Sequence, residues 1–149
     1  MTTTKQTKLD RRMLGLARHI SDWSKDPSTK VGCVIRKPDR SIALGINGFP
    51  AGVADTDERY NDRDTKYKLV VHGEPNAILN GGDVRGATLY NYPFSPCIRC
   101  AGLIIQAGIV RVVAPPCPED KRERWEKDLN EAIALLREAG LEYDEVALD

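Results

Sequence analysis

The chain has 149 residues, the length of one ordinary domain, and its 22 basic and 22 acidic side chains cancel. A net charge near zero argues against broad binding to nucleic-acid backbones, which usually requires a strongly basic face. No apolar run is long enough to span a bilayer, and the first residues lack the apolar segment of a signal peptide. We therefore expect one domain over residues 1–149, in the cytoplasm and with reduced cysteines.

The first half of the chain predicts one helix and two strands. Apolar residues at steps of three and four indicate an amphipathic helix over residues 6–25, which Asp26-Pro27-Ser28 ends. Strand-like runs follow at 31–36 and 41–46, joined by a turn. Residues 47–70 are polar with few apolar anchors, which predicts a long loop that is functional or mobile.

The second half alternates helices and strands. The predicted elements are a helix from Val71 or His72 to just before Gly81, a strand at 87–92, a helix at 97–107, a strand at 110–114, a helix at 118–139 and a strand at 143–148. Alternation of this kind predicts a sheet that is covered by helices on both faces.

Two short motifs carry residue types that bind metals. The first is His72-Gly73-Glu74, an H-x-E, and the second is Pro96-Cys97-Ile98-Arg99-Cys100, a P-C-x-x-C. One imidazole and two thiolates form a three-ligand zinc site with an open fourth position, as in catalytic zinc sites. Both motifs lie where helices are predicted to begin, and there the helix dipole favours thiolates. The sequence therefore predicts catalytic Zn²⁺ held by His72, Cys97 and Cys100.

Glu74 lies two residues beyond the predicted ligand His72, so we expect its carboxylate beside the metal and not on it. A carboxylate there can take a proton from a metal-activated water and pass it to a ring nitrogen and then to a leaving amine. Zinc lowers the pKa of its bound water from about 15.7 to about 7, which makes hydroxide available at neutral pH. Glu74 is the predicted catalytic residue.

Each motif alone has a plainer interpretation. An isolated H-x-E is usually a surface pair, and a C-x-x-C also occurs in structural zinc sites and redox pairs. A structural site needs a fourth protein ligand, and outside the motifs the only cysteines and histidine are Cys33, Cys117 and His19. Cys33 lies in an apolar run typical of a core, Cys117 lies between two prolines, and His19 falls in the first helix. The motifs together, with their spacing and the element order, favour catalytic zinc.

These motifs and their flanking segments resemble the cytidine and deoxycytidylate deaminase superfamily, most closely its deoxycytidylate (dCMP) branch. The H-x-E with P-C-x-x-C is a signature of zinc nucleobase deaminases. The resemblance runs from about residue 10 to residue 113. Besides the zinc motifs it includes Asp26-Pro27-Ser28-Thr29-Lys30-Val31-Gly32, Asn47-Gly48-Phe49-Pro50, Asn76-Ala77-Ile78, Gly86-Ala87-Thr88-Leu89-Tyr90 and residues 100–109.

The resemblance implies an α/β fold, a three-layer α/β/α sandwich with a mixed five-stranded sheet. It implies hydrolysis of dCMP to dUMP and ammonia by a homo-oligomer, a dimer or a hexamer. It also implies that Asn47 holds the sugar of the nucleotide, and that backbone groups near Pro96 and Cys97 fix the base.

Some positions depart from the family pattern. The family usually has alanine where this chain has Gly73, and an aliphatic residue where it has Pro75. The segment Asn91-Tyr92-Pro93-Phe94-Ser95 is also atypical and lies close to where the base should sit. These departures leave the deamination chemistry intact and leave the identity of the base open.

Further substrate contacts are predicted from residue type. Tyr92 or Phe94 can offer an aromatic face or edge to the base. The 47–70 segment holds the cations Arg59, Arg63, Lys66 and Lys68, and we expect one or two of them to bind a monophosphate, with Arg59 and Arg63 as the first candidates. Lys30 and Trp125 are interpreted as structural.

Three other functions stay open. The enzyme can be a deaminase of another base or nucleoside, such as guanine, a modified cytosine or an s-triazine-like amine. A nucleic-acid-editing deaminase is disfavoured by the zero net charge. A non-catalytic, zinc-stabilised binding module is disfavoured because a structural site has no use for an open position with Glu74 beside it.

Overall fold

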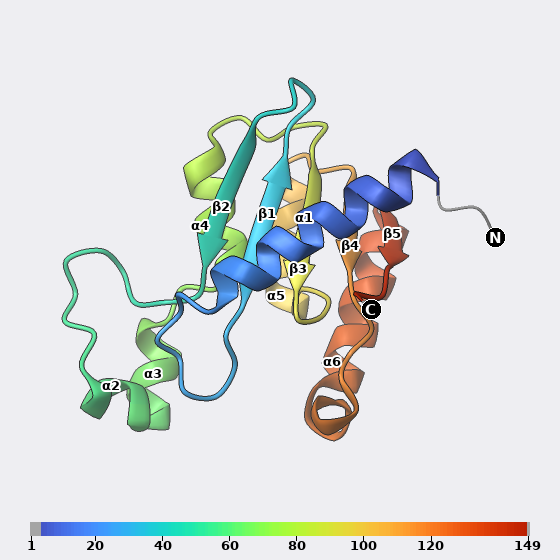
Figure 1. Ribbon diagram of the computed structural model, residues 1–149. Coiled ribbons are helices and arrows are strands. Elements are labelled where there is room, and N and C mark those ends of the chain that lie inside the picture. The colour runs from blue at the N-terminus through green and yellow to red at the C-terminus, as the bar shows by residue number, and fades with distance from the viewer. Residues whose placement is uncertain (1–3, 149) are drawn as a thin grey trace.

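The structure is a computed structural model that describes residues 4–148. Five strands form one mixed sheet in the order β2-β1-β3-β4-β5 (Figure 1). They are β1 (Gly32–Arg36), β2 (Ile42–Ile46), β3 (Thr88–Tyr92), β4 (Arg111–Ala114) and β5 (Glu142–Glu145). β1 pairs antiparallel with β2 and with β3, whereas the β3–β4 and β4–β5 pairs are parallel.

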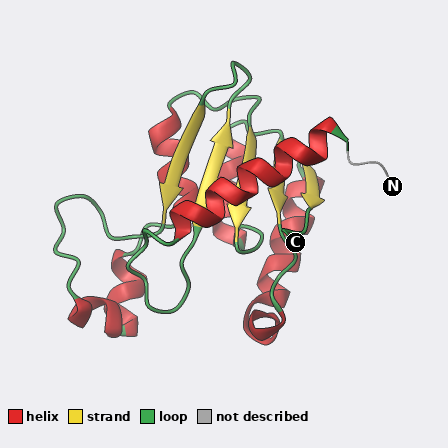
Figure 2. Ribbon diagram, in the orientation of Figure 1, coloured by secondary structure: helices red, strands yellow, loops and turns green. Residues whose placement is uncertain are grey.

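Helices cover both faces of this sheet (Figure 2). The helix α1 (Lys5–Ser21) crosses one face, and the other face carries α4 (Gly73–Gly81), α5 (Ile98–Gln106) and α6 (Glu119–Glu138). The expected α/β/α sandwich with a mixed five-stranded sheet is confirmed. No helix within residues 4–148 is long and apolar enough to cross a membrane.

The alternation of side chains along β1 divides the core into two clusters. Cys33 and Ile35 pack toward α4 and α5, whereas Val34 between them packs toward α1. Successive strand residues point to opposite faces of a sheet, so a strand that is buried on both sides is apolar throughout. Cys33 is fully buried, as the apolar run around it predicts.

The segment 47–70 is not the continuous loop that its polarity predicted. It contains two short helices, α2 (Asp57–Asn61) and α3 (Arg63–Leu69). The Thr56 side chain caps α2 by accepting from the backbone N–H of Arg59. Tyr60 is buried and stacks on Phe49, with ring centroids 4.1 Å apart. One aromatic pair therefore anchors a segment that has too few apolar residues to show a helical period.

The first helix also ends earlier than predicted, at Ser21 instead of near residue 25. Its last residues close a turn in which the N–H of Trp23 donates to the carbonyl of Ile20. The Ser24 hydroxyl then donates to the carbonyl of Asn47 at 2.8 Å. This tertiary hydrogen bond brings the segment after α1 to the end of β2.

Candidate active site

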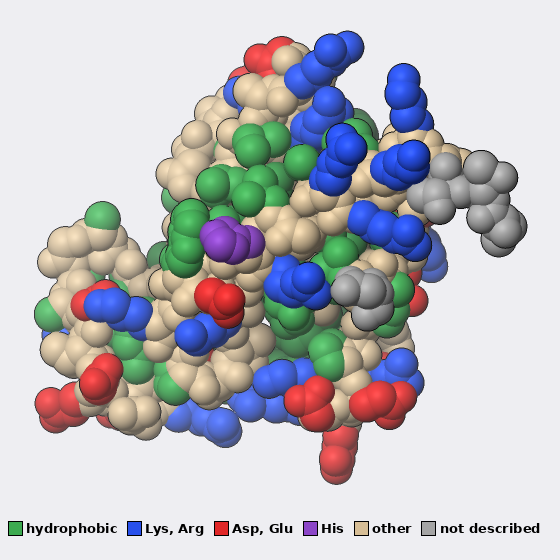
Figure 3. All heavy atoms as spheres, in the orientation of Figure 1, with side chains coloured by type: hydrophobic (Ala, Val, Ile, Leu, Met, Phe, Trp, Pro, Cys, Tyr) green, Lys and Arg blue, Asp and Glu red, His purple; other side chains and the backbone are tan. Residues whose placement is uncertain are grey.

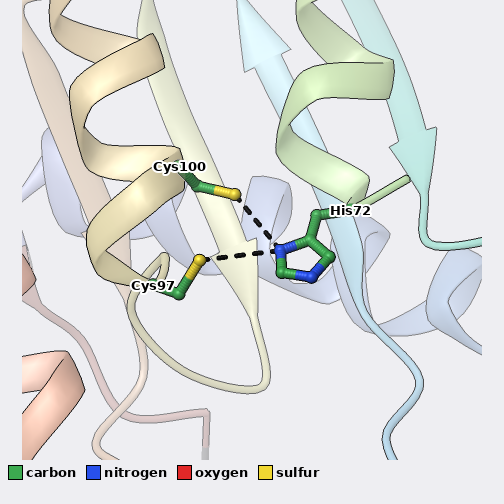
Figure 4. A group of neighbouring side chains, drawn as sticks. All are labelled: His72, Cys97 and Cys100. Carbon is green, nitrogen blue, oxygen red and sulfur yellow. Dashed lines mark hydrogen bonds between the residues drawn. The ribbon is translucent and has the colours of Figure 1, made fainter. Parts of the chain in front are cut away.

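The two motifs meet at the N-termini of α4 and α5. His72 is the N-cap residue of α4 and Cys97 is the N-cap residue of α5, and neither side chain makes a capping hydrogen bond. Pro75 occupies the first turn of α4, where its missing N–H costs no helical hydrogen bond. Cys100 lies one turn into α5, so both sulfur atoms face the same imidazole nitrogen (Figure 4).

The distances among these atoms suit one shared tetrahedral ion. His72 Nδ1 lies 3.3 Å from Cys100 Sγ and 3.6 Å from Cys97 Sγ. Zinc bonds of about 2.1 Å to nitrogen and about 2.3 Å to sulfur place these ligand atoms about 3.6 Å apart at tetrahedral angles. Within residues 4–148, His72, Cys97 and Cys100 form the one group of three or more His, Cys, Asp or Glu side chains close enough to hold an ion. The donor set fits Zn²⁺.

The two cysteines differ in their electrostatic surroundings. A hydrogen bond from the Cys100 thiol, with help from His72 and against the effect of burial, lowers the pKa of Cys97 to about 4. The same hydrogen bond and burial raise the pKa of Cys100. A coordinated divalent metal deprotonates its thiols outright, so the pair can supply two thiolate ligands.

Glu74 lies in the first turn of α4 and is only 4% exposed. Burial raises its pKa to about 7, although the charge of His72 opposes this effect. The Asn91 amide donates to Glu74 Oε2 at 3.3 Å. A carboxyl group with a pKa near the working pH can both accept and donate a proton, which is what a general acid–base needs.

A cleft opens over these residues. We define its floor as His72, Glu74, Asn91 and Cys97, which line the cleft, together with the metal-binding Cys100 beside them. We define its rim as Ser28, Thr29, Lys66, Tyr67, Arg124 and Trp125. The rim comes from three separate stretches of chain: the segment before β1, the helix α3 and the first half of α6.

Two of the predicted substrate contacts line the cleft, Asn47 and Phe94. The Asn47 side chain is largely occupied: its N–H groups donate to the Thr29 carbonyl at 2.9 Å and to Asp26 at 3.5 Å, and its oxygen accepts from the N–H of Val31 at 2.9 Å. Asn47 therefore holds the 26–31 segment in place. Contact between Asn47 and a sugar stays a prediction.

The other four predicted contacts lie outside the cleft lining. Tyr92 packs on the α1 side of the sheet, because alternation along β3 turns Asn91 toward the cleft and Tyr92 away from it. Arg59 is exposed and donates to the Ala54 carbonyl, and Arg63 is exposed and lies over the Tyr67 ring. Pro96 is buried, and its carbonyl accepts from the Ser95 hydroxyl.

The cleft lining also contains Lys66 and Trp125, which the sequence did not single out as first candidates. Lys66 was one of four cations in its segment, yet it is buried and reaches Asp26 and Ser28 at 3.2 and 3.3 Å. Trp125 lines the cleft, although the sequence suggested a structural role. The sequence did hold a signal for Trp125, because a tryptophan among the charged residues of α6 is unusual on a helix face that only contacts solvent.

The rim also contains linked side chains from α3 and α6. Arg124 donates to the Tyr67 hydroxyl at 2.8 Å, and its guanidinium lies 5.0 Å from the centre of the Trp125 ring. Trp125 in turn contacts the buried Phe94, with ring centroids 6.0 Å apart. Aromatic faces and a cation therefore stand together over the floor.

Comparison with known proteins shows the family. Residues 7–115 match the family described as the cytidine and deoxycytidylate deaminase zinc-binding region. A protein of Aliivibrio fischeri, described as an uncharacterized deaminase in the luxG 3' region, is 38% identical over 96% of this chain and 97% of that protein. The mouse deoxycytidylate deaminase is 45% identical over 60% of this chain and 54% of that protein. The chain thus spans about half the length of this mammalian relative.

Solved structures show the same fold. The dCMP deaminase of cyanophage S-TIM5 in apo form has a TM-score of 0.72 and 24% identity, covering 93% of this chain and 97% of that chain. Its match, the family match and the grouped His72, Cys97 and Cys100 agree. This chain belongs to the cytidine and deoxycytidylate deaminase family and is a zinc-binding hydrolytic deaminase.

Proposed function

We propose that this chain hydrolyses dCMP to dUMP and ammonia in the cleft described above. The observation that carries the proposal is the arrangement of the charged and metal-binding groups in the cleft. Its floor holds an acid–base carboxylate beside three metal-binding side chains, and its rim holds Lys66 and Arg124. A base placed toward the floor leaves its phosphate near these cations. The mouse and human relatives named deoxycytidylate deaminase support this substrate.

His72, Cys97 and Cys100 would hold the zinc ion. When bound, Zn²⁺ supplies acidity, since it lowers the pKa of a coordinated water from about 15.7 to about 7. Glu74 takes a proton from the water that attacks C4 of the cytosine ring, and delivers it to N3. Glu74 then transfers the second water proton to the amino group, which leaves as ammonia when the bond between C4 and nitrogen breaks. Water supplies the new oxygen, so the reaction needs no oxidant or reductant.

The rim would orient the nucleotide. Lys66 and Arg124 offer charge-assisted hydrogen bonds to a phosphate, and Ser28 offers a hydroxyl group 3.3 Å from the Lys66 ammonium. Phe94 and Trp125 offer aromatic surface to the base. Binding energy from the phosphate and sugar can then position C4 for attack, which raises the rate on the whole nucleotide above that on the free base.

Ammonia release from a panel of amines tests the proposal. The panel contains dCMP, deoxycytidine, cytosine, guanine and an s-triazine amine. We expect kcat/KM for dCMP to exceed that for deoxycytidine and cytosine by at least about 100-fold, equivalent to about 2.7 kcal/mol of transition-state binding. Equal kcat/KM for dCMP, deoxycytidine and cytosine would rule out nucleotide recognition.

A second candidate is a deaminase for another base. The feature that favours it is Gly73, because a Cβ at this position would lie 3.3 Å from Val31 Cγ1 and 3.4 Å from the Gly45 carbonyl oxygen. The backbone next to Glu74 is therefore closely packed against Val31 and β2, and a larger residue there would shift it. Strong activity on guanine or the triazine with none on dCMP would establish this alternative.

We also propose a homo-oligomer, a dimer or a hexamer, formed by one domain in the cytoplasm. Hydrophobic side chains gather over β2 and the C-terminal end of α1 (Figure 3). Trp23 is 59% exposed and lines a shallow hollow with Leu44 and Ile46 of this edge strand. Exposed apolar patches of this kind often mark subunit contacts. Sedimentation of the purified chain distinguishes the two assemblies from a monomer.

A further inference from the structure

We propose that Asn91 is a positioning residue that fixes the Glu74 carboxylate in the orientation needed for proton transfer. The inference rests on the proposed role of Glu74 and does not depend on which base is deaminated. Asn91 lies on β3, is 1% exposed and belongs to the floor of the cleft. It falls in the segment between Tyr90 and the P-C-x-x-C where this chain departs from the family pattern.

The hydrogen bonds of Asn91 connect the acid–base group to the segment that borders the base. Its Nδ2 donates to Glu74 Oε2 at 3.3 Å and to the Phe94 carbonyl at 2.9 Å. The Phe94 carbonyl can only accept, so it determines which end of the amide faces it. With this end fixed, the same nitrogen reaches Glu74 and holds Oε2, which leaves Oε1 outside the hydrogen bond.

The other end of the amide is unfavourable for the folded state. Asn91 Oδ1 is buried and has no hydrogen-bond partner among residues 4–148. An unpaired buried carbonyl oxygen destabilises the folded state and offsets part of the stability that the two hydrogen bonds of Nδ2 supply. An unpaired buried polar atom on a residue that contacts a catalytic group is typical of a functional site.

The strand geometry gives a matched control one residue away. Tyr90 is as buried as Asn91 but points to the α1 side, where its hydroxyl donates to Asp10 at 3.0 Å. Tyr90→Phe removes a buried hydrogen bond from the same strand without touching the cleft. It should lower the unfolding temperature and leave kcat within about twofold of wild type.

Asn91→Leu is the main variant, with Asn91→Ala as a smaller alternative should leucine not fit. We expect about one zinc per chain, an unfolding temperature lowered by no more than a few degrees because the Phe94 carbonyl loses its donor, and kcat lowered by about 10- to 100-fold, the usual effect of removing a group that orients a site residue. KM for the preferred amine should change by less than about threefold, because Asn91 acts on the proton shuttle and not on binding. Loss of zinc, or a raised KM with unchanged kcat, would overturn the proposal.

A double-mutant cycle with Glu74→Gln tests whether Asn91 acts through Glu74. Adding Asn91→Leu to Glu74→Gln should lower the residual activity by less than about threefold, because the group being positioned is already inactive. The same 10- to 100-fold loss in both backgrounds would overturn the proposal. An inactive Glu74→Gln beside a fully active Asn91→Leu would overturn the role of Asn91 alone. Full activity of Glu74→Gln would overturn the roles of both residues.

Discussion

The floor and the rim of the cleft are built differently. The floor takes its metal-binding and acid–base groups from two short motifs, each at the N-terminus of a helix packed on the sheet. The rim takes its side chains from the segment before β1, from α3 and from α6, and Tyr67 and Arg124 are exposed. The residues proposed for catalysis thus come from two short segments of sequence, whereas the residues proposed to bind the substrate come from distant parts of the chain.

The contrast has an energetic side. Electrostatic interactions are weakly screened around the buried Glu74 and Asn91 of the floor, and weaker around the exposed Tyr67 and Arg124 of the rim. Substitutions in the floor should therefore lower turnover on every substrate. Substitutions in the rim should have smaller effects, which depend on whether the substrate carries a phosphate.

The largest effect is expected at the metal ligands. Cys100→Ala should lose both zinc and activity, because the two remaining ligands leave the ion weakly held. Zinc content by atomic absorption and ammonia release measure the two losses. Cys117→Ala is the control, since Cys117 lies outside the ligand group, and it should keep about one zinc per chain. Full zinc content in Cys100→Ala would show that the ligand set is wrong.

The next largest effect is expected at Glu74. Glu74→Gln should fold and bind zinc but lose about 10²- to 10⁴-fold in kcat, since an amide cannot accept the proton of the attacking water. Steady-state kinetics with zinc analysis checks this expectation. The exposed Glu58 on α2 offers the matched control Glu58→Gln, with unchanged turnover. Turnover near wild type in Glu74→Gln would assign proton transfer to another group.

A moderate effect is expected at the rim. Arg124→Ala should raise KM for dCMP by about tenfold, equivalent to about 1.4 kcal/mol, and leave kcat/KM for deoxycytidine within about twofold. Lys127→Ala, an exposed cation on the same helix away from the cleft lining, is the control. The difference between the two substrates should shrink as salt is added. An equal loss on dCMP and deoxycytidine would place Arg124 against some part other than the phosphate.

The smallest effect on catalysis is expected on the opposite face of the sheet. Arg111 holds Asp10 with hydrogen bonds of 2.9 and 2.8 Å, and Tyr90 and Gln6 donate to the same carboxylate. Asp10→Asn should leave kcat within about twofold. It should lower the free energy of unfolding by about 1.5–3 kcal/mol at neutral pH, because Arg111 loses its hydrogen bonds to the buried carboxylate and keeps only its exposed partners, Asp144 and Glu142.

The pH dependence of this loss follows from the pKa of Asp10. Burial raises that pKa, but the hydrogen bonds from Arg111, Gln6 and Tyr90 outweigh burial and lower it below its usual 3.8. The carboxylate therefore stabilises the fold fully above pH 3.8, and this stability is lost as the pH falls through the lower pKa of the folded state. Unfolding curves of wild type and Asp10→Asn should converge below pH 3.8. A constant difference at acid pH would contradict the assignment.

Much of the architecture was predictable because it depends on local periodicity. Apolar spacing located the helices and strands of the sheet to within a few residues, and two sequence motifs predicted the zinc group that the structure brings together. The short helices α2 and α3 were not predicted, because their anchoring contacts are not helical ones. Tyr60 of α2 stacks on Phe49, and Lys66 of α3 pairs with Asp26, and both partners lie outside these helices.

The sequence by itself determined the chemistry of the floor, since His72, Glu74, Cys97 and Cys100 lie in segments whose spacing fixes their relation to two helix N-termini. Only the tertiary structure decided which residues line the rest of the cleft. Alternation along β3 turned Asn91 inward and Tyr92 outward, and the packing of the sheet brought Lys66 and Arg124 to one rim. The physical reason is that the type of a residue determines what its side chain can bind, whereas the direction in which the side chain points depends on long-range packing.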